Sequence, residues 1–252
     1  MKPIVLITGA SSGIGAACAR LYAAQGMNLL LTGRREALLL QLKSELESSF
    51  SIEVRIAVFD VQDEQAVNKA FQDIPSPWQS IDILINNAGL ALGRDTFDQA
   101  DIEDWKTMLH TNVEGLLFVS RAVLPWMMVR KKGHIVNIGS IAGRQVYERG
   151  NVYCASKAAV DAITKSMRID LLPHGIKVTG IHPGAVETEF SLVRFKGDAQ
   201  KAASTYQGFQ PLTAEDVART ILFCTSQPVH VCINDLELTP IQQANAYYYF
   251  KQ

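Results

Sequence analysis

The sequence predicts an α/β fold with a doubly wound parallel sheet and helices on both faces. Strand-like and helix-like segments alternate along nearly the whole chain, which is typical of parallel strands joined by crossover helices. The strand-like segments are continuous apolar runs such as Ile4–Thr8, as expected for strands covered on both faces. A glycine-rich turn joins this run to the first helix. Because no linker-like segment divides the chain, we expect one domain over residues 1–252.

The spacing of apolar residues defines each element in chain order. Short apolar runs mark the strands, whereas apolar residues three or four positions apart, such as Leu39, Leu42 and Leu46, mark the helices. The predicted strands are Ile4–Thr8, Met27–Thr32, Val54–Phe59, Ile81–Asn86, Ile135–Ile138, Val178–His182 and Asp235–Thr239. The predicted helices are Ile14–Gln25, Glu36–Ser49, Asp63–Asp73, Ile102–Val129, Tyr153–Leu171 and Ala214–Thr225. Pro183–Leu212 lacks a clear period, and we expect a substrate-covering insertion at about 184–212 because long irregular segments are usually functional.

Composition excludes several classes of protein. The chain has 252 residues, and its 24 Lys and Arg residues against 25 Asp and Glu residues give a formal net charge of −1. This balance disfavours a broad surface for nucleic acid or an anionic membrane. The four cysteines form no C-x-x-C pair, and no apolar run approaches the length of a membrane span. We therefore expect a reduced, cytoplasmic protein without a metal, a nucleic-acid partner or a membrane partner.

The glycine-rich turn and the end of the second strand indicate a dinucleotide. Thr8–Gly15 places three glycines between a strand and a helix, where the backbone can approach a pyrophosphate and the helix N-terminus attracts it. Proteins that bind NAD usually carry an acidic residue after the second strand, but Arg34 and Arg35 occupy that position here. Two guanidinium groups suit a 2′-phosphate, so the sequence favours NADP. The alternative is a solvated helix start.

A tyrosine and a lysine at helical spacing are the candidate acid–base pair. Lys157 follows Tyr153 by four residues, so both side chains lie on one helix face. A lysine ammonium can stabilise a phenolate, and we expect it to lower the pKa of Tyr153 toward the useful range. Such pairs are often only surface contacts. Ser140, whose hydroxyl can hold a substrate oxygen, favours the catalytic interpretation.

Several motifs stand in order at the expected strand ends. They are Thr8–Gly15, Asp60, Asn86–Gly89, Asn112, Ser140, Tyr153–Lys157, Pro183–Gly184 and Thr188. On these motifs the whole chain resembles the single-domain branch of the short-chain dehydrogenase/reductase family, which has a Rossmann-type fold. The resemblance implies that Tyr153 is the general acid/base, that Lys157 also binds the nicotinamide ribose, that Ser140 positions the substrate carbonyl and that Asn112 anchors a water in a proton relay. It also implies a homotetramer.

The resemblance assigns further residues to the cofactor. Together with Arg34 and Arg35, the expected cofactor contacts are Gly9, Ser11, Ser12, Gly13, Ile14, Gly15, Asp60, Val61, Asn87, Ala88, Gly89, Tyr153, Lys157, Pro183, Gly184, Val186 and Thr188. Asp60 and Val61 would meet the adenine, and the residues from Pro183 onward would meet the nicotinamide side.

The substrate is less well defined. The chain is similar to the NADP-dependent 3-hydroxy acid dehydrogenases, which implies a short 3-hydroxy acid or β-hydroxy amino acid as the small-molecule substrate. Arg194 is the expected partner of its carboxylate, although Arg194 could instead pin its loop; Lys196, Arg144 and Arg149 are the other candidate cations. A reductase of less polar carbonyls, such as a 3-oxoacyl thioester or a xenobiotic ketone, is the alternative, and a non-catalytic NADP-binding regulator is a remote one. The aromatic segment 247–250 could dock on a neighbouring subunit or pack on its own.

Overall fold

The computed structural model describes residues 2–252, and these residues form a seven-stranded sheet in which all neighbouring strands are parallel. Met1, which the predicted domain includes, lies outside the described residues. The strand order is β3-β2-β1-β4-β5-β6-β7. The strands are β1 Ile4–Ile7, β2 Asn28–Gly33, β3 Val54–Val58, β4 Ile81–Asn86, β5 Gly133–Ile138, β6 Ile176–Pro183 and β7 Asp235–Leu238.

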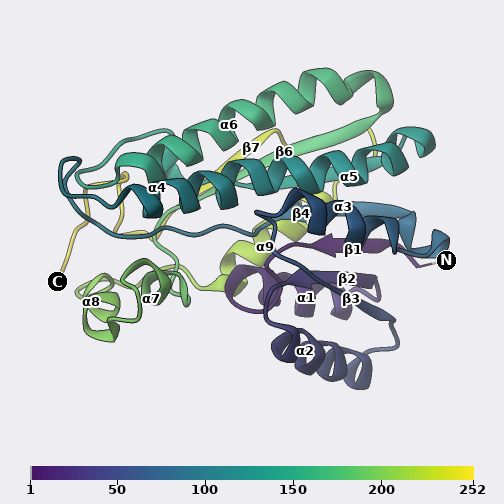
Figure 1. The fold of residues 1–252 in the computed structure, drawn as a ribbon, viewed down its shortest axis with the longest axis horizontal. Helices are drawn as coiled ribbons and strands as arrows, with labels where there is room; N and C mark the ends of the chain where they lie inside the picture. Colours follow the sequence, from purple (N-terminus) through teal and green to yellow (C-terminus); the bar gives the residue numbers. More distant parts are fainter. Residues whose placement is uncertain (1) are drawn as a thin grey trace.

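Helices cover both faces of this sheet (Figure 1). The α-helices are α1 Gly13–Ala24, α2 Glu36–Ser49, α3 Glu64–Gln72, α4 Ile102–Leu109, α5 Gly115–Arg130, α6 Asn151–Leu171, α7 Phe190–Arg194, α8 Ala199–Ser204 and α9 Ala214–Thr225. One apolar core joins the sheet to α1, α2 and α9, and the other joins it to α3, α5 and α6. The doubly wound architecture expected from the alternating pattern is therefore confirmed.

Two predicted segments differ from the structure in an informative way. The helix expected over 102–129 is interrupted by a π-helical turn at His110–Glu114, which separates α4 from α5. The segment expected to lack a period, 183–212, contains the short helices α7 and α8. Other boundaries differ by one or two residues, as fraying ends commonly do.

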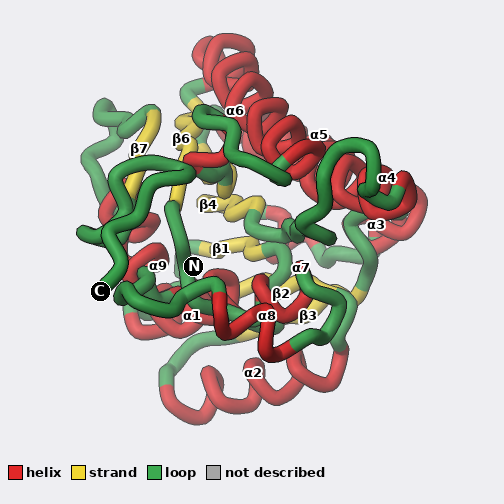
Figure 2. The backbone as a smooth tube through the Cα atoms, turned by 90° about the vertical axis from the view of Figure 1, so that its left-hand side faces the viewer, coloured by secondary structure: helices red, strands yellow, loops and turns green. Residues whose placement is uncertain are grey.

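From β1 the chain adds β2 and β3 on one side of the sheet, and from β4 onward it adds strands on the other side. At this switch point a crevice opens beyond the carboxyl ends of β1 and β4. Figure 2 looks onto this end of the molecule and shows α7, α8 and the C-terminal segment lying over it. A short 3₁₀ turn, Ile141–Gly143, follows β5 at the same end. Among residues 2–252, none of the helices is both long and apolar enough to cross a membrane.

Candidate active site

The glycine-rich turn at the carboxyl end of β1 lies close to the backbone of the loop after β4. Gly9 has a φ of +63°, and a Cβ atom there would lie 3.0 Å from the Cα atom of Ala88. Ser12, the N-cap of α1, makes no side-chain hydrogen bond to the first turn of the helix. The first N–H groups of α1 therefore remain available to an anion, and the helix dipole favours one there.

A cavity of about 350 Å³ extends from this turn along the crevice. The predicted cofactor residues that line it are Gly9, Ser11, Ser12, Gly13, Ile14, Arg34, Arg35, Asp60, Val61, Asn87, Ala88, Gly89, Tyr153, Lys157, Pro183, Gly184, Val186 and Thr188. Gly15 does not line it. A Cβ atom at Gly15 would lie 2.7 Å from Asn87 Nδ2 and against the Gly9 carbonyl, so this glycine lets α1 pack on the turn.

Sequence reasoning missed several residues that line the first cavity, among them Gly33 and Thr111. Gly33 lies at the end of β2, and Thr111 lies in the π-helical turn. The Thr111 hydroxyl is buried and has no hydrogen-bond partner among residues 2–252. The sequence pattern could not identify Thr111 as a cavity residue, because it predicted one uninterrupted helix over this segment and gave no sign of the π-helical turn that contains Thr111.

Arg34 and Arg35 lie at the outer end of the first cavity. The Arg34 guanidinium is 3.2 Å from a carboxylate oxygen of Asp60. Arg35 Nε donates to the Ser11 hydroxyl at 3.1 Å, and its Nη1 lies 2.9 Å from a Glu189 carboxylate oxygen. Both guanidinium groups are partly open to solvent, so an incoming phosphate can reach them. The structure thus brings both arginines to the same end of the cavity as the α1 N-terminus.

Tyr153 and Lys157 lie one turn apart on α6, and Ser140 faces them from the end of β5. The Ser140 hydroxyl accepts a hydrogen bond from the Ala142 N–H at 3.1 Å and so caps the 3₁₀ turn. Lys157 Nζ donates to the Ile138 carbonyl at 2.9 Å. All three catalytic candidates are largely buried at the rim of the crevice, where a small substrate can meet them together.

The pKa of the Tyr153 hydroxyl responds to burial and to neighbouring side chains. Burial raises the pKa of the Tyr153 hydroxyl, and the Ser140 hydroxyl and the Arg194 guanidinium act in the opposite direction. Burial lowers the pKa of the Lys157 ammonium from 10.5 to about 8. The contact of Lys157 is with the Ile138 carbonyl rather than with the phenol, so its expected effect on the Tyr153 pKa stays a prediction.

Asn112 occupies the π-helical turn and is buried. Its Oδ1 accepts from the Leu90 N–H at 2.8 Å, and its Nδ2 donates to the Leu90 carbonyl at 2.8 Å and to the Ser156 hydroxyl at 3.0 Å. The side chain therefore ties the loop after β4 to α6. Asn112 lines neither cavity, and its place in a proton relay stays a prediction.

A second cavity, of about 320 Å³, adjoins the first at the catalytic candidates. Five residues line both cavities: Ser140, Tyr153, Gly184, Val186 and Phe190. Arg194 lines the second cavity from the end of α7, with its guanidinium carbon 5.5 Å from the centre of the Tyr153 ring. Arg94 and Lys251 also line it, and sequence reasoning missed both because neither is near a motif.

Two of the other candidate cations lie outside this cavity, each with its own acidic partner. Lys196 Nζ is 2.8 Å from a carboxylate oxygen of Asp104. Arg149 is exposed and lies 3.8 Å from Glu148. Of the four cations considered from the sequence, Arg194 is the one that the structure brings to Ser140 and Tyr153.

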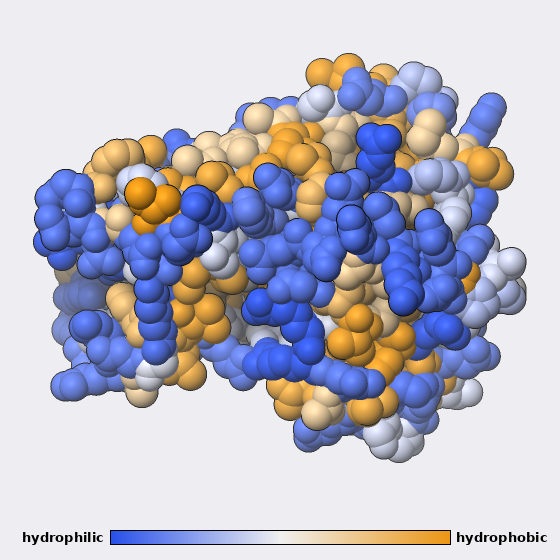
Figure 3. Space-filling model, viewed as in Figure 1, coloured by the Kyte–Doolittle hydropathy of each residue, from blue (hydrophilic) through white to orange (hydrophobic). Residues whose placement is uncertain are grey.

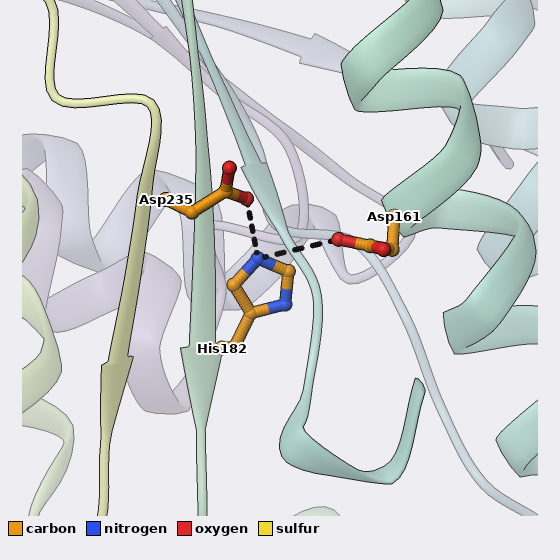
Figure 4. Close-up of side chains that lie close together, drawn as sticks. All are labelled: Asp161, His182 and Asp235. Carbon is orange, nitrogen blue, oxygen red and sulfur yellow. Dashed lines mark hydrogen bonds and ion pairs between the residues drawn. The ribbon is translucent and has the colours of Figure 1, made fainter. Parts of the chain in front are cut away.

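Arg144, the remaining candidate, joins a cluster behind the site. Asp161 and Asp235 lie on either side of the His182 ring (Figure 4). Arg144 Nη2 is 2.9 Å from Asp235 Oδ1, 3.3 Å from Asp161 Oδ1 and 3.0 Å from His182 Nε2. The guanidinium thus pairs with both carboxylates, to which Lys165 and Arg168 add further positive charge. The cluster links the 3₁₀ turn after Ser140 to α6, β6 and β7.

Within the aromatic segment 247–250, Tyr249 is the side chain that packs on its own chain. The Tyr249 and Phe209 rings are in tilted contact with their centres 4.9 Å apart, and Gln243 Nε2 donates to the Tyr249 hydroxyl at 2.8 Å. Tyr247 and Tyr249 line the second cavity. Tyr248 and Phe250 are exposed, as is much of Tyr247, so docking of this segment on a neighbouring subunit stays a prediction.

The family model for short chain dehydrogenases matches residues 3–198. The chain belongs to the short-chain dehydrogenase family. This short-chain dehydrogenase is 47% identical over 244 residues to an NADP-dependent 3-hydroxy acid dehydrogenase of Escherichia coli O6:H1, covering 96% of this chain and 97% of the relative. It is 46% identical over 245 residues to sulfoacetaldehyde reductase 2 of Chromohalobacter salexigens, covering 97% of this chain and 96% of the relative.

The structure of this dehydrogenase is also similar to experimentally solved structures. The closed form of a serine dehydrogenase complexed with NADP+ superposes with a TM-score of 0.93 at 45% identity, covering 99% of each chain. The resemblance read from the motifs is thus confirmed at the level of the family and of the fold.

Proposed function

We propose that this short-chain dehydrogenase uses NADP to interconvert a short 3-hydroxy acid or β-hydroxy amino acid and its 3-oxo form. The observation that carries the proposal is the Arg194 guanidinium, which lines the second cavity 5.5 Å from the Tyr153 ring. Its hydrogen bonds go to the Gly93 carbonyl and the Tyr147 hydroxyl, and no carboxylate within residues 2–252 forms an ion pair with it. A substrate carboxylate can therefore supply the missing negative charge.

The first cavity fits a dinucleotide with a 2′-phosphate. The uncapped start of α1 leaves N–H donors for a pyrophosphate, and Gly9 and Gly13 line the cavity beside it. Arg34 and Arg35 offer paired donors to the 2′-phosphate. NADP+ bound there supplies a hydride acceptor. The relatives named for NADP support this choice.

The residues of this chain then handle the proton. During oxidation, the Tyr153 phenolate oxygen takes the proton of the substrate hydroxyl while Ser140 Oγ holds the substrate oxygen. Lys157 Nζ binds the ribose hydroxyls beside them, and Asn112 helps to return the proton to solvent. Arg194 fixes the carboxylate and so orients the reacting carbon. In this proposal, segment 184–212 of a single domain covers the substrate.

The alternative substrate is a less polar carbonyl compound, and the walls of the second cavity favour it. Phe190, Tyr206 and Phe209 line the cavity, and its volume exceeds what a three-carbon acid fills. The remote alternative is a regulator without activity, which would have no use for Ser140 and Tyr153 on one cavity rim.

One assay separates these functions. NADP reduction is followed with L-serine, L-allo-threonine, 3-hydroxypropionate and 2-hydroxyethanesulfonate, and with 2-butanol as the uncharged comparison. We expect turnover of the acids but poor turnover of 2-butanol, and Arg194→Ala should raise KM for the acids about 10- to 100-fold because a charge-assisted contact is lost. Preference for 2-butanol would replace the proposal with the less polar alternative. Bound NADP without turnover of any substrate would favour the regulator.

We further propose a cytoplasmic homotetramer. Apolar side chains stand exposed on α4, α5 and α6, as Figure 3 shows along the upper side of the molecule. Leu109, Leu117, Val129 and Ile169 are among them. Exposed apolar side chains of this kind support contact between copies. Light scattering on the purified protein tests the expected mass of four chains.

A further inference from the structure

Arg194 is fixed between two tyrosine side chains. Its guanidinium carbon lies 5.6 Å from the centre of the Tyr147 ring and 5.5 Å from the centre of the Tyr153 ring. Nη1 donates to the Tyr147 hydroxyl at 2.9 Å, and Nε donates to the Gly93 carbonyl at 3.1 Å. Two directed hydrogen bonds hold this cation at one place, so its charge acts on the Tyr153 ring at a defined distance.

The titratable and charged groups that face Tyr153 come from four segments. They are Ser140 at the end of β5, Tyr147 before α6, Cys154 and Lys157 on α6, and Arg194 at the end of α7. Two of these groups are cations. Lys157 directs its ammonium at the Ile138 carbonyl, whereas Arg194 directs its guanidinium at the two tyrosines and has no carboxylate partner within residues 2–252.

The two cations also differ in chemical type, one being an ammonium group and the other a guanidinium group. Burial lowers the pKa of Lys157 to about 8, so this ammonium loses its charge under mildly alkaline conditions. A guanidinium stays protonated throughout the range in which proteins are folded. The Arg194 charge lowers the pKa of Tyr153, whose burial raises it. Arg194 is the cation that lies over the Tyr153 ring.

We propose that Arg194 promotes loss of the Tyr153 hydroxyl proton in the enzyme without substrate, and that a bound substrate carboxylate withdraws this assistance. The second half rests on the proposed function, in which Arg194 holds that carboxylate. Neutralising the guanidinium makes the phenolate a stronger base at the moment when the substrate hydroxyl must give up its proton. The proton passes from that hydroxyl to the Tyr153 oxygen, and a bound NADP+ would accept the C–H electron pair as hydride.

The expected size of the effect follows from the distance. Opposite unit charges about 6 Å apart, with screening between that of water and that near a protein surface, shift a pKa by roughly 0.5 to 2 pH units. Removing the charge in Arg194→Gln should move the Tyr153 titration upward by this amount. Arg194→Lys keeps the charge, and the titration should then return toward that of the wild type.

The test uses the holoenzyme with saturating NADP+ and a neutral secondary alcohol, which brings no carboxylate. We expect the rise of kcat/KM with pH to move upward in Arg194→Gln and to be largely restored in Arg194→Lys. Lys69→Gln, at an exposed position on α3, is the control and should leave the profile unchanged. Tyrosinate absorbance, measured as the difference from Tyr153→Phe, reports the same titration without turnover.

With a 3-hydroxy acid, the wild-type midpoint seen in kcat should lie above the midpoint seen in kcat/KM, since kcat reports the complex that contains the carboxylate. This separation should vanish in Arg194→Gln. Unchanged alcohol and tyrosinate titrations in Arg194→Gln would overturn the inference, even if KM for the acids rises as the proposed function expects. A shifted titration with unchanged KM for the acids would support the effect on Tyr153 and refute carboxylate binding by Arg194.

Discussion

Lys157 is a buried ammonium group, and we predict that replacing it makes the folded protein more stable. The side chain is 7% exposed, and burial lowers its pKa from 10.5 to about 8. At pH 7 the folded state must therefore keep a charged group away from water. Lys157→Met has a similar length without a charge, so it removes that cost while it abolishes the proposed contact with the ribose.

The magnitude follows from the two pKa values. A difference between 10.5 and about 8 is worth about 3 kcal/mol at pH 7, at roughly 1.4 kcal/mol for each pH unit. Loss of the hydrogen bond from Nζ to the Ile138 carbonyl costs about 1 kcal/mol. The expected net gain in the free energy of unfolding of Lys157→Met is therefore about 2 kcal/mol.

The folded-state pKa of Lys157 is lowered, so its contribution to the free energy of unfolding rises with pH, whereas the contribution of a lysine with a raised pKa would fall as pH rises. Between the folded and unfolded pKa values of Lys157, the unfolded chain binds the proton and the folded chain does not, so the wild type gains stability as pH rises from 8 to 10.5. The advantage of Lys157→Met is thus greatest at pH 7 and should fall to under about 1 kcal/mol at pH 9.5.

The assay is urea unfolding without cofactor at pH 7 and pH 9.5, at one protein concentration, monitored by tryptophan fluorescence. Lys69→Met, at an exposed position on α3, controls for the change of residue type. A Lys157→Met protein that is less stable than the wild type at pH 7 would refute the reasoning. So would an advantage of equal size at both pH values.

Three further substitutions test the cofactor end and the acid–base residue. Arg34→Asp should raise the Kd for NADP about 10- to 100-fold but spare NAD, measured by fluorescence titration, and an equal loss for both would contradict a 2′-phosphate site. Tyr153→Phe should abolish turnover with the Kd for NADP within about threefold of the wild type, and retained turnover would exclude Tyr153 as the base. Gly15→Ala should cost about 1 to 3 kcal/mol in urea unfolding, because its Cβ meets Asn87 and the Gly9 carbonyl, and an unchanged midpoint would show that α1 can shift.

The fold could be predicted because each element carries its own local pattern. The run Ile4–Ile7 is apolar at every position, as a strand covered on both faces requires, and Leu39, Leu42 and Leu46 mark the buried side of α2. The interruption at His110–Glu114 escaped prediction because a π-helical turn adds one residue while the pattern on both sides stays helical.

The cofactor cavity followed from residues at strand ends, because parallel strands bring their carboxyl ends to one edge. Contacts between distant segments could not be predicted in the same way. Nothing in the spacing indicates that Arg144 meets Asp161 and Asp235 behind the site, or that Gly15 serves packing rather than the cavity. The sequence also indicated Lys157 as a cation on the same helix face as Tyr153, but spacing alone could not predict that Arg194, from α7, lies over the Tyr153 ring.

The link between Gly93 and Arg194 has a kinetic consequence. The Gly93 N–H donates to the Arg194 carbonyl at 2.9 Å, and Arg194 Nε donates back to the Gly93 carbonyl at 3.1 Å, so α7 parts from the loop after β4 only when both bonds break. Arg194, which we propose binds the substrate carboxylate, thus also holds α7 against the loop after β4. A product that keeps its carboxylate would bind Arg194 and strengthen this link, which must break before the product can leave. Turnover of acids should therefore slow with solvent viscosity, whereas turnover of neutral alcohols should not.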